Sequence, residues 1–239
     1  MTDTARDIWV YLSASPLAGL TFTLVAYQVG LWIHGKCKRH PLVNPVLIAV
    51  ALLSTLLILT DTEYGTYFEG AQFVHFLLGP ATVALAVPLY RQFAHVRRSA
   101  AALAVALVVG SLTAAGSAVG IAWLLDGSTA LLVSLAPKSA TAPIAMAIAE
   151  DMGGLPTLTA VLVMLTGIIG AAFGTGVLNL IRVHDPRVQG FALGLASHGI
   201  GTARAVQLGE TAAAFSGLAM GLNGLATAVL LPLIATFLL

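Results

Sequence analysis

Charged side chains are scarce in this chain, in which only 9% of 239 residues are Asp, Glu, Lys or Arg. A soluble domain averages roughly 25% charged residues, so this chain has too few of them to cover a surface that faces water. Hydrophobic residues make up 58% of the sequence, and 24 residues are glycine. The composition therefore indicates an integral membrane protein.

The sequence also lacks the features of several functional classes. Its single cysteine cannot form an internal disulfide, and a net charge of +1 gives no reason to expect nucleic-acid binding. The six histidines are scattered without metal-ligand spacing, and there is neither a nucleophile elbow nor a P-loop. We therefore expect no enzyme, no catalytic residue, no metal and no cofactor.

Long uncharged runs are abundant, and four of them exceed the roughly 20 residues that cross a bilayer as a helix. They cover residues 8–33, 99–125, 152–181 and 211–239, with weaker candidates at 46–60 and 71–90. We predict an all-α polytopic membrane protein with about six to eight segments in contact with the lipid bilayer. Residues 1–239 are expected to form one membrane domain, with scaffold helices in 1–125 and a substrate-site bundle in 126–239.

The charges that are present collect in short loops, and their signs suggest a topology. Under the positive-inside rule, the basic loops lie in the cytoplasm; they are loops 34–40, 91–98 and 182–189. All three share one side only if segments 129–151 and 190–210 enter the membrane and return. We predict that both segments are re-entrant or discontinuous. Two simple crossings remain the alternative, because about 22 residues are long enough to span.

Residues that interrupt helices occur in both segments. Pro143 lacks a backbone donor, and Pro137 disfavours helical geometry in the residue before it. In the second segment, Gly199 and Gly201 loosen the backbone. A threonine follows each break, and its hydroxyl suits it to cap a new half-helix; these residues are Thr141 and Thr202.

The two broken segments also match each other at a spacing of 60 residues, which places Lys138 over His198 and Glu150 over Glu210. This match suggests an internal duplication, which is inverted if both segments re-enter. Corresponding broken segments in two halves of a membrane protein indicate a transporter site.

Ionisable groups at membrane depth usually face a cavity or a partner. We predict a site for a small anion, most simply a carboxylate. It would be formed by the N-termini of two half-helices together with Lys138, His198 and Arg204. The rest of the predicted substrate-binding set comprises hydroxyls and glycines of the two breaks: Ser139, Thr141, Ser197, Gly199, Gly201 and Thr202.

Simpler interpretations of the same residues stay open. Lys138 can extend its amine to the membrane interface, and His198 can be a packed side chain whose hydrogen bonds are satisfied. Glu150 and Glu210 lie at segment ends, where they serve either in ion coupling, in an ion pair with Arg204, or as solvated loop residues.

Four stretches resemble the LrgB/CidB family of bacterial membrane proteins. They are "NPVLIAVALL", "HFLLGPATVALAVPLYRQ", "PKSATAPIAMAIAEDMGGLPTLTAVLVMLTGIIGA" and "DPRVQGFALGLASHGIGTARAVQLGETAAAFSGLAMGL". The resemblance covers roughly residues 20–235. The chain departs from the family's pattern at Ala142, where threonine is frequent, and at Gly199, where alanine is frequent.

The resemblance implies a multi-pass protein of the bacterial cytoplasmic membrane. The family is described as antiholin-like: it modulates murein hydrolase activity and cell lysis together with a small LrgA/CidA-type membrane partner. A similar plastid protein exchanges glycolate and glycerate, and some bacterial members are linked to pyruvate uptake. The resemblance thus leaves two expectations, a carrier of small monocarboxylates, which we expect to be a homodimer, or a regulator that transports nothing.

Overall fold

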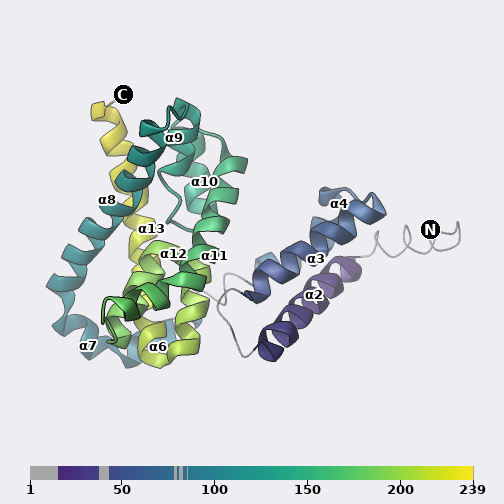
Figure 1. Ribbon diagram of the computed structural model, residues 1–239, viewed down its shortest axis with the longest axis horizontal. Coiled ribbons are helices and arrows are strands. Elements are labelled where there is room, and N and C mark those ends of the chain that lie inside the picture. The colour runs from purple at the N-terminus through teal and green to yellow at the C-terminus, as the bar shows by residue number, and fades with distance from the viewer. Residues whose placement is uncertain (1–15, 38–42, 78–79, 81–82, 85, 239) are drawn as a thin grey trace, which may run out of the picture. The chain divides into compact units, whose positions relative to one another are not determined.

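We describe a computed structural model of residues 16–37, 43–77, 80, 83–84 and 86–238. These residues are almost all helical and include no strand. The chain divides into two compact units, residues 1–84 and residues 85–239, and each is described by itself (Figure 1). The predicted all-α class is therefore confirmed for the described part of the chain.

The first unit contains three helices, α2 (Pro16–Lys36), α3 (Pro45–Thr60) and α4 (Tyr64–Phe76). The Asn44 side chain caps α3, because its oxygen accepts hydrogen bonds from the first backbone N–H groups of that helix. Glycines bring the helices close together. A Cβ on Gly30 would lie 2.5 Å from the Pro45 carbonyl oxygen, and one on Gly19 would lie 2.6 Å from that of Tyr67.

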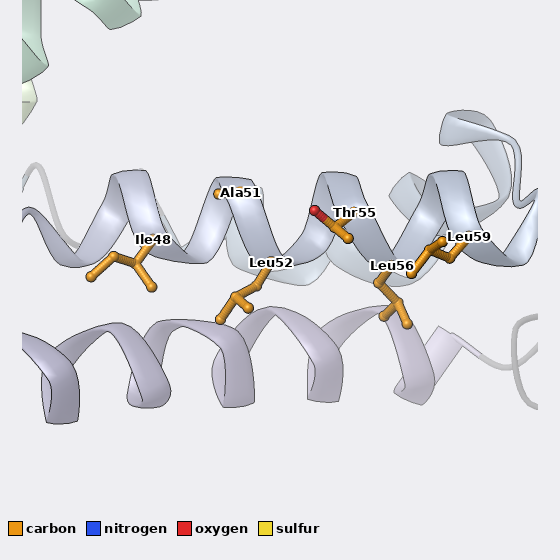
Figure 2. A pocket seen from close by; sticks show the side chains of 6 residues that line it. All are labelled: Ile48, Ala51, Leu52, Thr55, Leu56 and Leu59. Carbon is orange, nitrogen blue, oxygen red and sulfur yellow. The ribbon is translucent and has the colours of Figure 1, made fainter.

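One side of α3 carries a shallow groove, shown in Figure 2. The groove offers a polar solute one hydroxyl and no charge, so it is a poor candidate for an anion site. It is lined by Ile48, Ala51, Leu52, Thr55, Leu56 and Leu59.

The second unit begins with two short helices, α6 (Ala86–Arg91) and α7 (Phe93–Arg98). In Figure 1, these two lie at one end of the unit, while α9 and α10 lie at the other end, near the end of α13. The remaining helices are α8 (Ala100–Leu124), α9 (Thr129–Leu135), α10 (Ala142–Asp151), α11 (Pro156–Leu180), α12 (Pro186–Leu208) and α13 (Glu210–Leu238).

Four described helices are long and apolar enough to cross a membrane: Leu17–Lys36, Ala100–Leu124, Pro156–Leu180 and Glu210–Ile234. They coincide with the four longest uncharged runs. The helix α3 is apolar but shorter. The run 71–90 is not described as one helix, because α4 ends at Phe76 and α6 begins at Ala86, with residues 78–79, 81–82 and 85 outside the described part.

The boundary between the two compact units lies at residue 84. The helix α8 belongs to the second unit, where it packs against α9, α12 and α13. The division into scaffold helices and a substrate-site bundle at residue 125 stays a prediction. Glycines allow the tightest packing, between α12 and α13. A Cβ on Gly190 would lie 2.2 Å from the Ala212 carbonyl oxygen, and one on Gly194 would lie 2.1 Å from that of Ser216.

Candidate functional site

The first break in a helix separates α9 from α10 and covers residues 136–141. Ala136 keeps helical angles (φ −52°, ψ −48°), although Pro137 was expected to disfavour them. The chain turns after Pro137, with Ala140 N–H donating to the Pro137 carbonyl oxygen at 2.9 Å. Pro143 stands in the first turn of α10, where a missing donor costs little. Pro137 therefore lies at the beginning of the break, and Pro143 lies just after it.

After this break the chain returns toward the end from which α9 came. The Leu155 N–H, at the start of α11, donates to the Ser134 hydroxyl at 2.8 Å. Farther along α11, Val163 packs with Ala140 and Ala145. The chain thus advances beside α11 between residues 134 and 140, and α10 then ends only four residues before Leu155. Ser134, in the last turn of α9, and Asp151, at the end of α10, therefore both lie near the start of α11.

The second break lies inside α12, at Ser197 (φ −127°, ψ 16°) and His198 (φ 42°, ψ −133°). A Cβ on Gly201 would lie 2.3 Å from the Leu193 carbonyl oxygen. In a straight helix, residues eight apart are separated by about 12 Å, so the chain reverses at the break. Leu193 also packs with Ala205 on the returning half. The helix α12 is thus a tight hairpin of two half-helices.

The two threonines that were candidates for helix caps differ in their position and in their side-chain hydrogen bonds. Thr141 occupies the N-cap position of α10, but its side chain makes no capping hydrogen bond. Thr202 does not cap the second half of α12, so that prediction is wrong. Its hydroxyl donates to the His198 carbonyl oxygen at 2.9 Å and bonds to the Ser216 hydroxyl at 2.9 Å. The physical reason is that the break precedes both glycines, which places Thr202 inside the first turn.

Asn223 joins the two breaks, and the sequence interpretation missed it. Its amide nitrogen donates to the carbonyl oxygens of Ser139 at 3.0 Å and Leu195 at 3.1 Å. Its amide oxygen accepts from the Ser111 hydroxyl at 2.6 Å. The side chain is only 1% exposed. A signal was available, because Asn223 is the only amide side chain in the uncharged run 211–239, and a polar group at that depth needs partners.

The His198 ring lies against α11. Its Nε2 is 2.8 Å from the Val163 carbonyl oxygen, and because a carbonyl can only accept, Nε2 is the donor. In the neutral ring, Nδ1 then carries the lone pair. Gly167 makes room for the ring, since a Cβ there would lie 2.6 Å from the ring's Cε1. Gly170 does the same for Ser197, whose hydroxyl oxygen a Cβ would overlap.

Lys138 contributes a positive charge to the same region. Its amine is 3.4 Å from the Ser139 hydroxyl. The Ser139 carbonyl oxygen is linked through the Asn223 amide to Leu195, two residues before the second break. Within residues 16–37, 43–77 and 86–238, the ion pairs are Arg91–Glu210 and Arg187–Asp185. Lys138 is therefore partly buried without an acidic partner there, which is unfavourable unless an anion or water solvates it.

Three predicted residues lie away from the breaks. Arg204 lies about two turns after the second break, where it donates to the Gln207 side chain at 2.7 Å and leaves its Nε buried without a partner. Glu150 is exposed near the end of α10. Glu210 pairs with Arg91 at 3.3 Å. The structure thus brings together Lys138, Ser139, Ser197 and His198, with the N-terminus of α10 beside them.

The meeting point of the two breaks is polar and has an excess of positive potential. It combines the amine of Lys138 with the start of α10, whose first N–H groups have no side-chain cap and carry partial positive charge. Ser111 and Asn223 lie near the middle of α8 and α13, so the site lies at mid-depth in these helices. Among the residues that the structure describes, no cluster of His, Cys, Asp and Glu could hold a metal ion.

Long apolar helices around a polar centre formed by two broken segments define a polytopic helical membrane protein. The chain belongs to the LrgB-like family, whose family model matches residues 23–237. It is 32% identical to "Antiholin-like protein LrgB" of Bacillus mycoides (strain KBAB4) over 223 residues, which cover 93% of this chain and 97% of that protein. The proteins of the same name from Bacillus cereus (strain B4264) and Bacillus anthracis (strain CDC 684 / NRRL 3495) match with the same identity and coverage. No solved structure matches this chain.

Proposed function

We propose that this protein is a secondary carrier or facilitator of small monocarboxylates, of the size of glycolate, glycerate or pyruvate, in the bacterial cytoplasmic membrane. The observation that supports this proposal is Lys138, a partly buried amine with no acidic partner in the described chain, next to the uncapped start of α10. A small carboxylate would supply the missing negative charge. Its oxygens would accept hydrogen bonds from the amine and from backbone N–H groups.

The proposed topology has segments 129–151 and 190–210 re-entering the membrane from opposite sides, as an inverted pair. The contact of Ser134 with Leu155 favours a return of the first segment, and the contact of Gly201 with Leu193 favours a return of the second. The ion pair of Arg91 with Glu210 then keeps the end of the second segment on the side of the basic loop 91–98. Discontinuous segments of this kind form the substrate sites of many secondary transporters.

The proposed transport cycle moves two hairpins, α9 with α10 and the two halves of α12, against the remaining helices. A homodimer would hold these remaining helices in place. Three ionisable groups could couple transport to protons. His198 lies at the meeting point of the breaks, whereas Glu150 and Glu210 lie at segment ends. We therefore assign the coupling role to His198 within this proposal.

Uptake of labelled glycolate, glycerate and pyruvate into liposomes that contain the purified protein tests the carrier proposal. Lys138→Ala should abolish uptake, because it removes the charge that attracts the anion. Lys36→Ala is the matched control, since Lys36 is exposed at the end of α2 and lies over the Trp32 ring, and it should leave uptake unchanged. Normal uptake by the Lys138→Ala protein would refute the assigned site.

A second candidate function is that of a regulator that transports nothing. The name of these relatives, antiholin-like protein, favours it. In this alternative, the protein binds a small LrgA/CidA-type membrane partner and controls cell lysis and murein hydrolase activity. A lysis assay separates the two functions. A regulator that transports nothing should change the rate of cell lysis equally in its native and Lys138→Ala forms. A carrier should lose its effect on cell lysis when Lys138 is replaced by alanine.

A further inference from the structure

Asn223 uses nearly all of its hydrogen-bonding capacity to connect segments that are far apart in the sequence. Both amide hydrogens are engaged, one by the Ser139 carbonyl in the first break and one by the Leu195 carbonyl before the second. The amide oxygen accepts from Ser111 on α8. One buried side chain on α13 thus contacts α8 and both broken segments.

Each accepting carbonyl lacks its ordinary helical partner because of the breaks. In an unbroken α12, the Leu195 carbonyl would accept from the N–H of Gly199, but the reversal at residues 197–198 lies between them. Ser139 lies in the turn between α9 and α10. An unpaired carbonyl at membrane depth is strongly unfavourable, so the amide of Asn223 substitutes for two missing helical donors.

The two carbonyls determine which way the amide points, because a carbonyl oxygen can only accept. If the amide were reversed, its oxygen would face two carbonyl oxygens and repel them. The Ser111 hydroxyl donates to the amide oxygen at 2.6 Å, so the oxygen also has a partner in the orientation in which the nitrogen faces both breaks. Ser111 therefore supports Asn223, and Asn223 in turn holds the two breaks.

We propose that Asn223 is the positioning residue that fixes the two breaks relative to each other around the anion site, with Ser111 as the hydrogen-bond partner of its amide oxygen. The two hairpins then move as a coupled pair, because separating them breaks at least one of the amide's two donated bonds. The consequence for transport rests on the proposed carrier function, whereas the consequence for the distance between the hairpins does not.

A distance measurement tests the coupling without any assumption about transport. In a Cys37→Ser background, cysteines replace two exposed alanines, Ala147 on α10 and Ala203 on the returning half of α12. Spin labels there report the distance between the hairpins by pulsed electron resonance in liposomes. With Asn223 present, we expect one narrow distance distribution. Asn223→Ala should broaden it or add a second population.

Uptake kinetics supply the second readout. Asn223→Ala should lower the maximal rate roughly tenfold or more, because both breaks lose a buried donor. Ser111→Ala should give a smaller loss in the same direction, and Ser111→Thr, which keeps the hydroxyl, should restore uptake. Thr227→Val is the matched control, because Thr227 is buried one turn farther along α13 and makes no hydrogen bond to either break. It should leave both readouts unchanged.

The outcomes separate the inference from the proposed function. A broadened distribution with lost uptake supports both. A broadened distribution in a protein that takes up no carboxylate, even with Asn223 intact, supports the positioning role and rejects the carrier. A distribution that stays narrow in Asn223→Ala overturns the inference, whether or not uptake is lost. If Asn223→Ala does not fold, Ser111→Ala and Ser111→Thr are compared instead. A broader distance distribution and slower uptake in Ser111→Ala, both restored in Ser111→Thr, support the inference. An unchanged distribution in Ser111→Ala overturns it.

Discussion

The two broken segments reach similar geometry by different local means. The first break is a turn of residues 136–141 that contains Pro137 and is followed by Pro143, so proline residues mark the interruption of the helix. The second break occupies two residues without a proline, and His198 adopts a positive φ of 42°, which costs of order 1–3 kcal/mol in a residue that is not glycine. Tertiary contacts of the His198 ring with Gly167 and Val163 offset that cost.

The breaks also contribute different chemistry. The first supplies a charge, Lys138, and the exposed start of a helix. The second supplies an imidazole whose donor is already bound to the Val163 carbonyl. Asn223 bonds to both. In the proposed function, the first segment attracts the anion, the second carries the proton, and Asn223 on α13 keeps the two segments together.

The largest effect concerns the side of the membrane on which each hairpin opens. In a Cys37→Ser background, single cysteines at Thr129 and Asp151 should react with a membrane-impermeant maleimide only from outside. Cysteines at Arg187 and Gln207 should react only from inside; all four positions are exposed. Reaction of positions 129 and 151 from opposite sides would show that segment 129–151 simply crosses the membrane, and the two broken segments would then differ in topology.

A large effect on stability should distinguish two glycines of the second hairpin. Gly194→Ala places a methyl group 2.1 Å from the Ser216 carbonyl oxygen, so the backbone of α12 or α13 must move. We expect a loss of about 2–3 kcal/mol in unfolding free energy, read from thermal unfolding in detergent. Gly199→Ala should change stability by less than about 0.5 kcal/mol, because its nearest neighbour is Met220 Sδ at 4.0 Å. Equal effects would show that the hairpin does not rest on this backbone contact.

The smallest effect concerns the caps at which the segments begin. Asp185 caps α12 by accepting from the Arg187 N–H at 2.9 Å, whereas the Ser128 hydroxyl accepts from Leu131 N–H at 3.4 Å at the start of α9. Asp185→Ala should therefore cost about 1 kcal/mol of unfolding free energy, and Ser128→Ala about half of that. A larger loss of unfolding free energy for Ser128→Ala would show that the Ser128 cap is the stronger of the two.

The first of these caps should also depend on pH. Hydrogen bonds from the Arg187 side chain hold the pKa of the Asp185 carboxyl below its ordinary value. The unfolded carboxyl thus takes up a proton at a higher pH than the folded one. The stabilisation is complete above the ordinary value of 3.8 and is lost as the pH falls through the lower folded pKa. Asp185→Asn, which keeps a capping oxygen, should lack this pH dependence in the same unfolding assay.

Composition and charge predicted the helical membrane class, because long uncharged runs form long helices; the run 99–125, for example, contains α8. Pro137 and Pro143 also located the first break to within a few residues. The second break lies before Gly199, because its cause is the packing of His198 into the space above Gly167. Such packing depends on residues more than 30 positions away, which no local pattern contains.

Asn223 shows the same limit from the other direction. Its type was visible as a lone amide in an apolar run, but its partners lie 112, 84 and 28 residues away in the sequence. Arg204 illustrates the converse, because its charge and its place near the second break predicted a site residue, yet it lies two turns beyond the break and donates to Gln207. Residue type thus predicts that a polar group has a partner, while the folded path decides which one.

A binding measurement shows whether the meeting point of the two breaks holds a small carboxylate through Lys138. Glycolate, glycerate and pyruvate are titrated by isothermal calorimetry into the purified protein, the Lys138→Gln variant and the Lys36→Gln control. We expect at least one of these anions to bind, Lys138→Gln to weaken its binding roughly tenfold or more, and Lys36→Gln to leave it unchanged. Equal affinity in all three proteins, or no binding to any of them, would refute the assigned anion site.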